Sequence, residues 1–105
     1  MARRPPRYSP AAHLVLQHCL AAPTRWFHGY TLIQQLGLSS GTLYPVLMRL
    51  AEGGWLDTAW EAARRAGRPP RHLYRLANGA TSDARALVRR WNERGVPIPA
   101  LRHAT

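Results

Sequence analysis

The chain has no lysine, one cysteine, one phenylalanine and five acidic residues, against 15 arginines in 105 residues. The lone cysteine, Cys19, excludes a disulfide within the chain and favours a reducing compartment. No apolar run approaches the length that spans a bilayer, which argues against a membrane segment. The expected location is therefore the cytoplasm.

The residues that catalysis and metal binding require are sparse and scattered. Five histidines and one cysteine show no zinc-ligand spacing. The acidic residues form no evident acid–base pair, and no glycine-rich loop that would cradle a phosphate occurs. The sequence therefore predicts no catalytic residue, no metal site and no cofactor.

The charge balance is strongly one-sided. A formal net charge of +10 indicates a polyanionic partner, with nucleic acid as the first candidate. The exclusive use of arginine fits guanidinium groups that grip phosphates, and it fits a GC-rich genome equally well. With 46% hydrophobic residues, the chain is expected to form one domain with one modest core.

The N-terminal part predicts a basic arm followed by a helix. Residues 1–9 hold three arginines around two prolines and are expected to be a flexible arm, which either lies in a minor groove or only adds nonspecific attraction. Residues 10–22 carry apolar residues at helical spacing, with His13 and Gln17 on the polar stripe. The apolar band is wide, which fits either a dimer partner or tight packing inside a small monomer.

Two short helices with a brief connection are predicted in residues 28–52. The first, 29–36, is expected to end at Gly37, because glycine adopts the left-handed conformation without a side-chain clash. The second is expected to begin after Ser39 or Ser40 as N-cap. A connection of about three residues forces a steep angle between the helices, as in a helix-turn-helix DNA reader.

The second of these helices is predicted to bury one face and expose the other. Apolar residues at spacings of three, four and seven form the buried stripe, which consists of Leu43, Val46, Leu47 and Leu50. The opposite face carries Gly41, Thr42, Pro45, Met48, Arg49 and Glu52, with Tyr44 on a flank.

Residues 55–61 and 72–76 are rich in aromatic and branched residues and predict a β-hairpin with a long loop. A hairpin placed directly after a recognition helix would be the wing of a winged helix. Trp55 and Trp60 are expected in the core. The wing carries four arginines, Arg64, Arg65, Arg68 and Arg71.

A last helix is predicted to begin with Thr81 or Ser82 as N-cap, and a short tail, 96–105, follows it. One stripe of this helix is apolar and contains Ala84, Leu87, Val88 and Trp91.

Three motifs occur in order between residues 29 and 76. They are Gly29-Tyr30-Thr31-Leu32, then Ser39-Ser40-Gly41-Thr42-Leu43-Tyr44-Pro45-Val46-Leu47 with Arg49-Leu50, and finally Gly67-Arg68-Pro69 before Tyr74-Arg75-Leu76. In these motifs the chain resembles the PadR family of bacterial transcriptional regulators. It departs from the family pattern in Met48, where lysine is common, in a short connection before Ser39, and in the extra Pro70.

The resemblance implies a dimeric winged helix-turn-helix protein, usually a repressor. The expected fold is mainly α with a small β-hairpin, divided into a flexible basic arm (1–9), a winged helix-turn-helix DNA-binding domain (10–79), a C-terminal dimerisation helix (80–95) and a tail (96–105). The residues expected at a homodimer interface are Leu14, Val15, Leu87, Val88 and Trp91.

The expected partner is double-stranded DNA, read as a pseudo-palindromic operator within the nucleoid. Carried over by position, Ser40, Thr42, Tyr44 and Arg49 face DNA from the recognition helix and Arg68 from the wing. Arg64, Arg65 and Arg71 are expected to neutralise phosphates.

Several alternatives stay open at this point. Arg49 is either a DNA contact or a solvated arginine, and Tyr44 either contacts DNA or packs against the wing. Trp91 either packs in the dimer or lines a pocket for a small, flat aromatic effector. The alternative function is a nonspecific nucleic-acid-binding or protein-interaction module.

Overall fold

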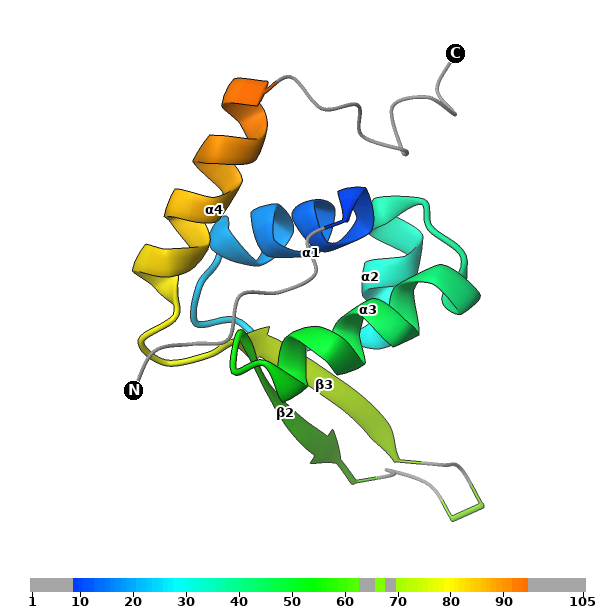
Figure 1. Ribbon diagram of the computed structural model, residues 1–105. Coiled ribbons are helices and arrows are strands. Elements are labelled where there is room, and N and C mark those ends of the chain that lie inside the picture. The colour runs from blue at the N-terminus through cyan, green and yellow to red at the C-terminus, as the bar shows by residue number, and fades with distance from the viewer. Residues whose placement is uncertain (1–8, 63–65, 68–69, 95–105) are drawn as a thin grey trace.

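The computed structural model describes residues 9–62, 66–67 and 70–94. It consists of four helices and three strands (Figure 1), in the order α1 Pro10–Leu20, β1 Phe27–His28, α2 Gly29–Leu36, α3 Ser40–Glu52, β2 Leu56–Glu61, β3 Arg71–Leu76 and α4 Thr81–Arg94. The predicted mainly α fold with a small hairpin is therefore confirmed. The predicted arm, apart from Ser9, the predicted tail and the wing residues Arg64, Arg65 and Arg68 lie outside the described residues.

Helix α1 lies in the middle of the helical layer, with α4 on one side and α2 and α3 on the other (Figure 1). It begins where Ser9 caps it, because the Ser9 hydroxyl accepts the Ala12 N–H at 3.2 Å. Val15, Leu16 and Cys19 have no exposed surface. Much of the wide apolar band of α1 is therefore covered by its own chain, while Leu14, Leu20 and Ala22 are only partly buried.

The connection between α2 and α3 has the local structure expected of a helix-turn-helix. Gly37 adopts a φ of 69° and donates its N–H to the Ile33 carbonyl at 3.0 Å, which ends α2. Only Gly37, Leu38 and Ser39 separate the two helices. Ser39 is the N-cap of α3, as one of the two predicted serines.

The three strands form an antiparallel sheet in the order β1-β3-β2. Strand β1 was not predicted, because two residues carry no periodic pattern; Phe27 and His28 pair with Tyr74 and Leu73 of β3. The β2–β3 hairpin projects from the helical body, and its far end points away from α4 (Figure 1). This is the arrangement of a wing.

The sheet buries Trp55 at its base but leaves Trp60 exposed, so the prediction that both lie in the core is wrong for Trp60. Residues 56, 58 and 60 share one face of β2 because side chains alternate along a strand. Leu56 lies within the core, whereas Trp60 lies further out along the hairpin and is 67% exposed. Trp60 lies on the same face of β2 as the buried Leu56, but the apolar core does not extend to the outer end of the strand.

The prediction that His13 lies on a polar stripe is also wrong. His13 is fully buried, and its ring stacks on that of Trp91 in α4, with 5.6 Å between centroids and 27° between planes. Helix α4 covers this side of α1, which no pattern within α1 could reveal. Among the described residues, no helix is both long enough and apolar enough to cross a bilayer.

The buried His13 predicts a loss of stability in mild acid. Burial lowers the pKa of His13, although a hydrogen bond with the Asn92 side chain opposes that shift. As pH falls below about 6.5, the ordinary histidine value, the unfolded chain binds a proton that the folded protein resists, so the free energy of unfolding decreases. We expect the Tm to fall between pH 7 and pH 5.

The matched variant is His13→Phe, which keeps a ring against Trp91 but cannot titrate. Its Tm should fall less over the same pH range, as measured by circular dichroism. An equally steep fall in both proteins would mean that other groups cause it.

Candidate nucleic-acid interface

Helix α3 presents a polar face to solvent, as the sequence predicted. Its buried residues are Leu43, Val46, Leu47 and Leu50, the predicted stripe. The exposed face consists of Ser40, Gly41, Thr42, Tyr44, Pro45, Met48, Arg49 and Glu52. The hydroxyl groups of this face lie near the start of the helix and its guanidinium group lies in the last turn.

The start of α3 is held in place by Ser39. Its hydroxyl oxygen accepts the Thr42 N–H at 3.3 Å, and the hydroxyl donates to Thr42 Oγ1 at 3.1 Å. Thr42 Oγ1 therefore serves as an acceptor within the helix cap and keeps its own proton to donate outward. Its orientation is fixed before any partner arrives.

Tyr44 packs against the first turn of α2 rather than standing free. A Cβ added to Gly29 would lie 2.8 Å from Tyr44 Cε1 and 3.2 Å from the Tyr44 hydroxyl oxygen. The side chain is nevertheless 38% exposed, so packing and outward contact are compatible. This contact also explains why a glycine precedes Tyr30, since only glycine leaves room for the ring.

This packing predicts a coupling between residues 29 and 44. Gly29→Ala should lower the free energy of unfolding by about 1 kcal/mol, because the new methyl group displaces the Tyr44 ring. In a Tyr44→Ala background the same substitution should cost nothing. Urea unfolding of the four proteins in the double-mutant cycle measures the difference.

Gly41→Ala is the control for that cycle, since nothing lies within 4 Å of a Cβ at Gly41. It should raise stability by roughly 0.5 to 1 kcal/mol through reduced chain entropy alone. Equal losses from Gly29→Ala with and without the Tyr44 ring would contradict the packing argument.

A chain of aromatic contacts runs through the wing beside α3. The Tyr74 hydroxyl and His72 Nδ1 are hydrogen-bonded at 2.9 Å, and the His72 ring stacks on Trp60 at 4.2 Å with 11° between the planes. Burial raises the pKa of Tyr74, and the nearby phenol of Tyr44 adds to this shift. Trp60 and His72 were missed as site residues, and the only sequence signal was an aromatic pair close to an arginine-rich loop.

Two polar side-chain contacts tie the sheet together beside this face. His28 Nε2 of β1 lies 3.1 Å from Glu61 Oε1 of β2, and Arg75 donates to Asp57 at 3.2 Å. All four side chains are one-third exposed or more, so each pair contributes little to stability. The contact between His28 and Glu61 instead holds the start of α2 close to the outer end of β2, since His28 directly precedes α2 and Glu61 is the last residue of β2.

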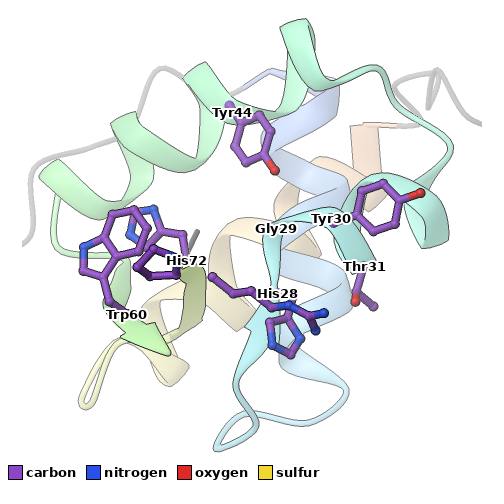
Figure 2. Close-up of a pocket in the computed structure, with 9 residues that line it drawn as sticks. His28, Gly29, Tyr30, Thr31, Tyr44, Trp60 and His72 are labelled. Atoms are coloured by element: carbon purple, nitrogen blue, oxygen red, sulfur yellow. The ribbon is translucent and has the colours of Figure 1, made fainter. Parts of the chain in front are cut away.

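A pocket of about 370 Å³ lies between the start of α2, α3 and the wing. Figure 2 shows Trp60 and His72 together on one side, Tyr30 and Thr31 on the other, and Tyr44 reaching in from α3. Of the four predicted wing arginines, the structure describes Arg71, which is exposed and lines this pocket. Arg64, Arg65 and Arg68 lie outside the described residues.

Of the five residues predicted for a dimer interface, two are buried within the chain. Val15 is wholly enclosed by its own chain and Val88 is 8% exposed, because α4 packs on α1 of the same chain. The expectation of a partner contact is therefore corrected for Val15. Leu14, Leu87 and Trp91 are only partly buried.

Trp91 stacks on His13 within the chain. A separate groove of about 530 Å³ runs between α1 and α4, and it is lined by Gln17, Leu20, Arg85, Val88, Arg89, Asn92 and Glu93. Trp91 lines neither this groove nor the pocket beside the wing.

The described side chains offer little for catalysis. Burial raises the pKa of the Cys19 thiol to about 12, so it stays protonated and unreactive. Within residues 9–62, 66–67 and 70–94, no three histidine, cysteine or acidic side chains gather in a metal-binding arrangement.

The comparisons with known proteins agree with this geometry. Residues 19–82 match the model of the "Transcriptional regulator PadR-like family", which covers more than half of the chain. None of the curated proteins compared with the chain matches it.

Solved structures extend the likeness to most of the chain. The circadian clock associated protein Pex from Anabaena is 27% identical over 86% of this chain and 84% of its own, with a TM-score of 0.63. A PadR family transcriptional regulator from Eggerthella lenta is 28% identical over 79% and 71%, with a TM-score of 0.57. A PadR-like transcription factor from Bacteroides fragilis, at 24% identity over 90% and 88%, shares the fold with a TM-score of 0.63.

This family comprises transcription regulators rather than enzymes. The matched residues include α2, α3 and both strands of the wing. The chain therefore belongs to the PadR-like family of transcriptional regulators, and it is a DNA-binding regulator with a winged-helix fold.

Proposed function

We propose that the protein is a sequence-specific repressor that binds a pseudo-palindromic operator as a homodimer. Helix α3 enters the major groove, and the wing lies on the backbone or in the minor groove. The observation that carries the proposal is the exposed polar face of α3, whose side chains are positioned by contacts within the chain. The proposed place of action is the nucleoid, in the cytoplasm.

The groups on this face suit the edges of base pairs. Ser40 and Thr42 supply hydroxyls at the start of α3, where a recognition helix approaches the bases, and Tyr44 supplies a phenol beside them. Arg49 supplies a guanidinium, which pairs in bidentate fashion with guanine or grips a phosphate. Pre-positioning of Thr42 by Ser39 reduces the entropy lost on binding.

The wing supplies the sequence-independent part of the affinity. Arg71 is exposed where β3 begins, and Arg64, Arg65 and Arg68 precede it in the chain. Arginines bound to phosphates release counterions and fix the protein on the duplex. The pairing of Asp57 with Arg75 lessens the repulsion between this wing carboxylate and DNA.

The dimer is proposed to form along α1 and α4. Leu14, Leu87 and Trp91 retain exposed surface there, and the groove between the two helices offers a second contact area. A two-fold dimer presents two copies of α3, which is why the operator is proposed to be pseudo-palindromic. A repressor of this kind acts by occupying its site and excluding other proteins.

The proposal is tested by fluorescence anisotropy with a duplex from the upstream region of the protein's own gene and with a scrambled duplex. Each is measured at two salt concentrations. We expect the upstream duplex to bind about a thousandfold more tightly, and the ratio to persist as salt rises.

If the upstream and scrambled duplexes bind with equal affinity, and both affinities fall steeply as salt rises, sequence-specific recognition is contradicted. Such results would favour a nonspecific module in which the net charge of +10 supplies the affinity.

A further inference from the structure

The wing carries a stacked pair of aromatic rings that the proposed duplex contacts do not use. Trp60 of β2 is 67% exposed, although a large aromatic side chain gains much from burial. The His72 ring of β3 lies nearly parallel to the indole, with 4.2 Å between the ring centroids and 11° between the planes. Figure 2 shows the two rings together at one side of the pocket between α2, α3 and the wing.

The pair is held in place by the core of the fold. His72 Nδ1 is hydrogen-bonded to the Tyr74 hydroxyl at 2.9 Å, and the centroids of these two rings lie 4.5 Å apart. Tyr74 is 2% exposed and belongs to the core. The ring that backs the indole therefore cannot turn away without losing contacts to a buried side chain. Trp60 thus presents a flat surface in a fixed orientation.

A flat aromatic surface binds the face of another ring, and base faces are accessible only in single strands. In a duplex each base is stacked between its neighbours, so a protein in the grooves meets only the edges of the bases. In a single strand the faces are open, and bases stack on exposed aromatic side chains with little regard to sequence. The surface of Trp60 therefore suits an unpaired base.

The pocket provides for the rest of a nucleotide. Its volume of about 370 Å³ lies within the range of small-molecule sites. Arg71 lines it and is exposed, and a guanidinium pairs readily with a phosphate. Tyr30 and Tyr44 add phenol groups from two other elements. No acidic side chain is among the described lining residues, and the nearby Glu61 is hydrogen-bonded with His28 at 3.1 Å.

We propose that this pocket gives the protein a second binding mode, for single-stranded DNA. One unpaired base stacks on Trp60, and its phosphate lies near Arg71. This mode depends on the side chains of the pocket and not on a preferred operator. Single strands are present wherever a duplex has been opened, so the mode extends the proposed function to melted DNA.

Fluorescence anisotropy of the full chain with two labelled single strands of about ten nucleotides tests the proposal. One strand is oligo-dT, and the other has the same phosphates but an abasic site in place of every base. We expect oligo-dT to bind about tenfold more tightly at each of two salt concentrations, because the charge of the two strands is equal. Trp60→Ala should abolish this preference by weakening the binding of oligo-dT. Its fold should survive because the side chain is exposed.

Trp26→Ala is the matched control, because Trp26 stacks with Arg75, at 4.3 Å, and does not line the pocket. It should keep the preference for oligo-dT, with circular dichroism as the check on folding of all variants. Arg71→Gln should weaken the binding of both strands by a similar factor, since both carry phosphates.

Equal binding of the two strands by the wild-type protein would overturn the proposal. A preference for oligo-dT that survives in Trp60→Ala, or one that is lost in a folded Trp26→Ala, would do the same. An oligo-rU strand of equal length that binds more tightly than oligo-dT would overturn the assignment to DNA in favour of RNA.

This test is independent of the proposed repressor function, which is measured on duplexes. If oligo-dT is preferred through Trp60 while the upstream and scrambled duplexes bind equally, the single-strand mode stands and the repressor proposal fails. If the upstream duplex is preferred and the abasic strand binds as tightly as oligo-dT, the repressor proposal stands and the single-strand mode is wrong.

Discussion

Leu43→Ala will lower the free energy of unfolding by about 2 to 5 kcal/mol, the range for a leucine deleted from a well-packed core. Leu43 has no exposed surface and lies on α3 between Thr42 and Tyr44. The substitution removes apolar contacts and leaves a cavity under the recognition helix. A domain of this size has only about 5 to 15 kcal/mol of stability, so a large share is lost. Urea unfolding at pH 7 measures the difference.

The control substitution is on the same helix. Met48 is 59% exposed, so Met48→Ala removes a similar volume from the outer face and should change stability by less than about 0.5 kcal/mol. Leu43→Met, which keeps the volume, should cost less than about 1.5 kcal/mol. A small loss for Leu43→Ala would mean that the site collapses around the cavity and that α3 is less firmly packed than its burial indicates.

Arg49→Ala will weaken binding to the preferred duplex by about 1 to 3 kcal/mol, which is roughly 5- to 150-fold in Kd. Arg49 is exposed on the face of α3 proposed to enter the major groove. If its guanidinium is bidentate to a guanine, the loss is confined to duplexes that carry that base pair. Fluorescence anisotropy with a panel of single-base-pair substitutions, at fixed salt, measures it.

Arg90→Ala serves as the control, because it removes the same charge from the exposed surface of α4. It should change the Kd by less than about twofold if charge at a distance is screened. A loss from Arg49→Ala that is uniform over all duplexes would identify a phosphate contact. No loss would show a solvated arginine.

The helix-turn-helix was predictable because its signals are local. Gly37 ends α2 through its own backbone conformation, and Ser39 caps α3 through a bond to a residue three positions away. The buried stripe of α3 follows from a repeat of three and four residues. The three PadR motifs lie in this part of the chain and in the wing, so the family too was visible in the sequence.

The pocket beside the wing depends on contacts that no local pattern encodes. Tyr44 lies against Gly29, 15 positions earlier, and the Trp60–His72 pair forms only when β2 and β3 align in register. Strand β1 exists only because β3 pairs with it. The order of residues along the chain does not show which of these side chains line the same pocket.

The sequence by itself determined a compact basic domain with a helix-turn-helix, a wing and a recognition face, since composition, capping and periodicity act over a few residues. The tertiary structure decided how these parts meet. It buried His13 under α4, enclosed Val15, left Trp60 outside the core and brought Tyr44, Trp60 and Arg71 around one pocket. Burial is a property of the space between elements, which only their packing fixes.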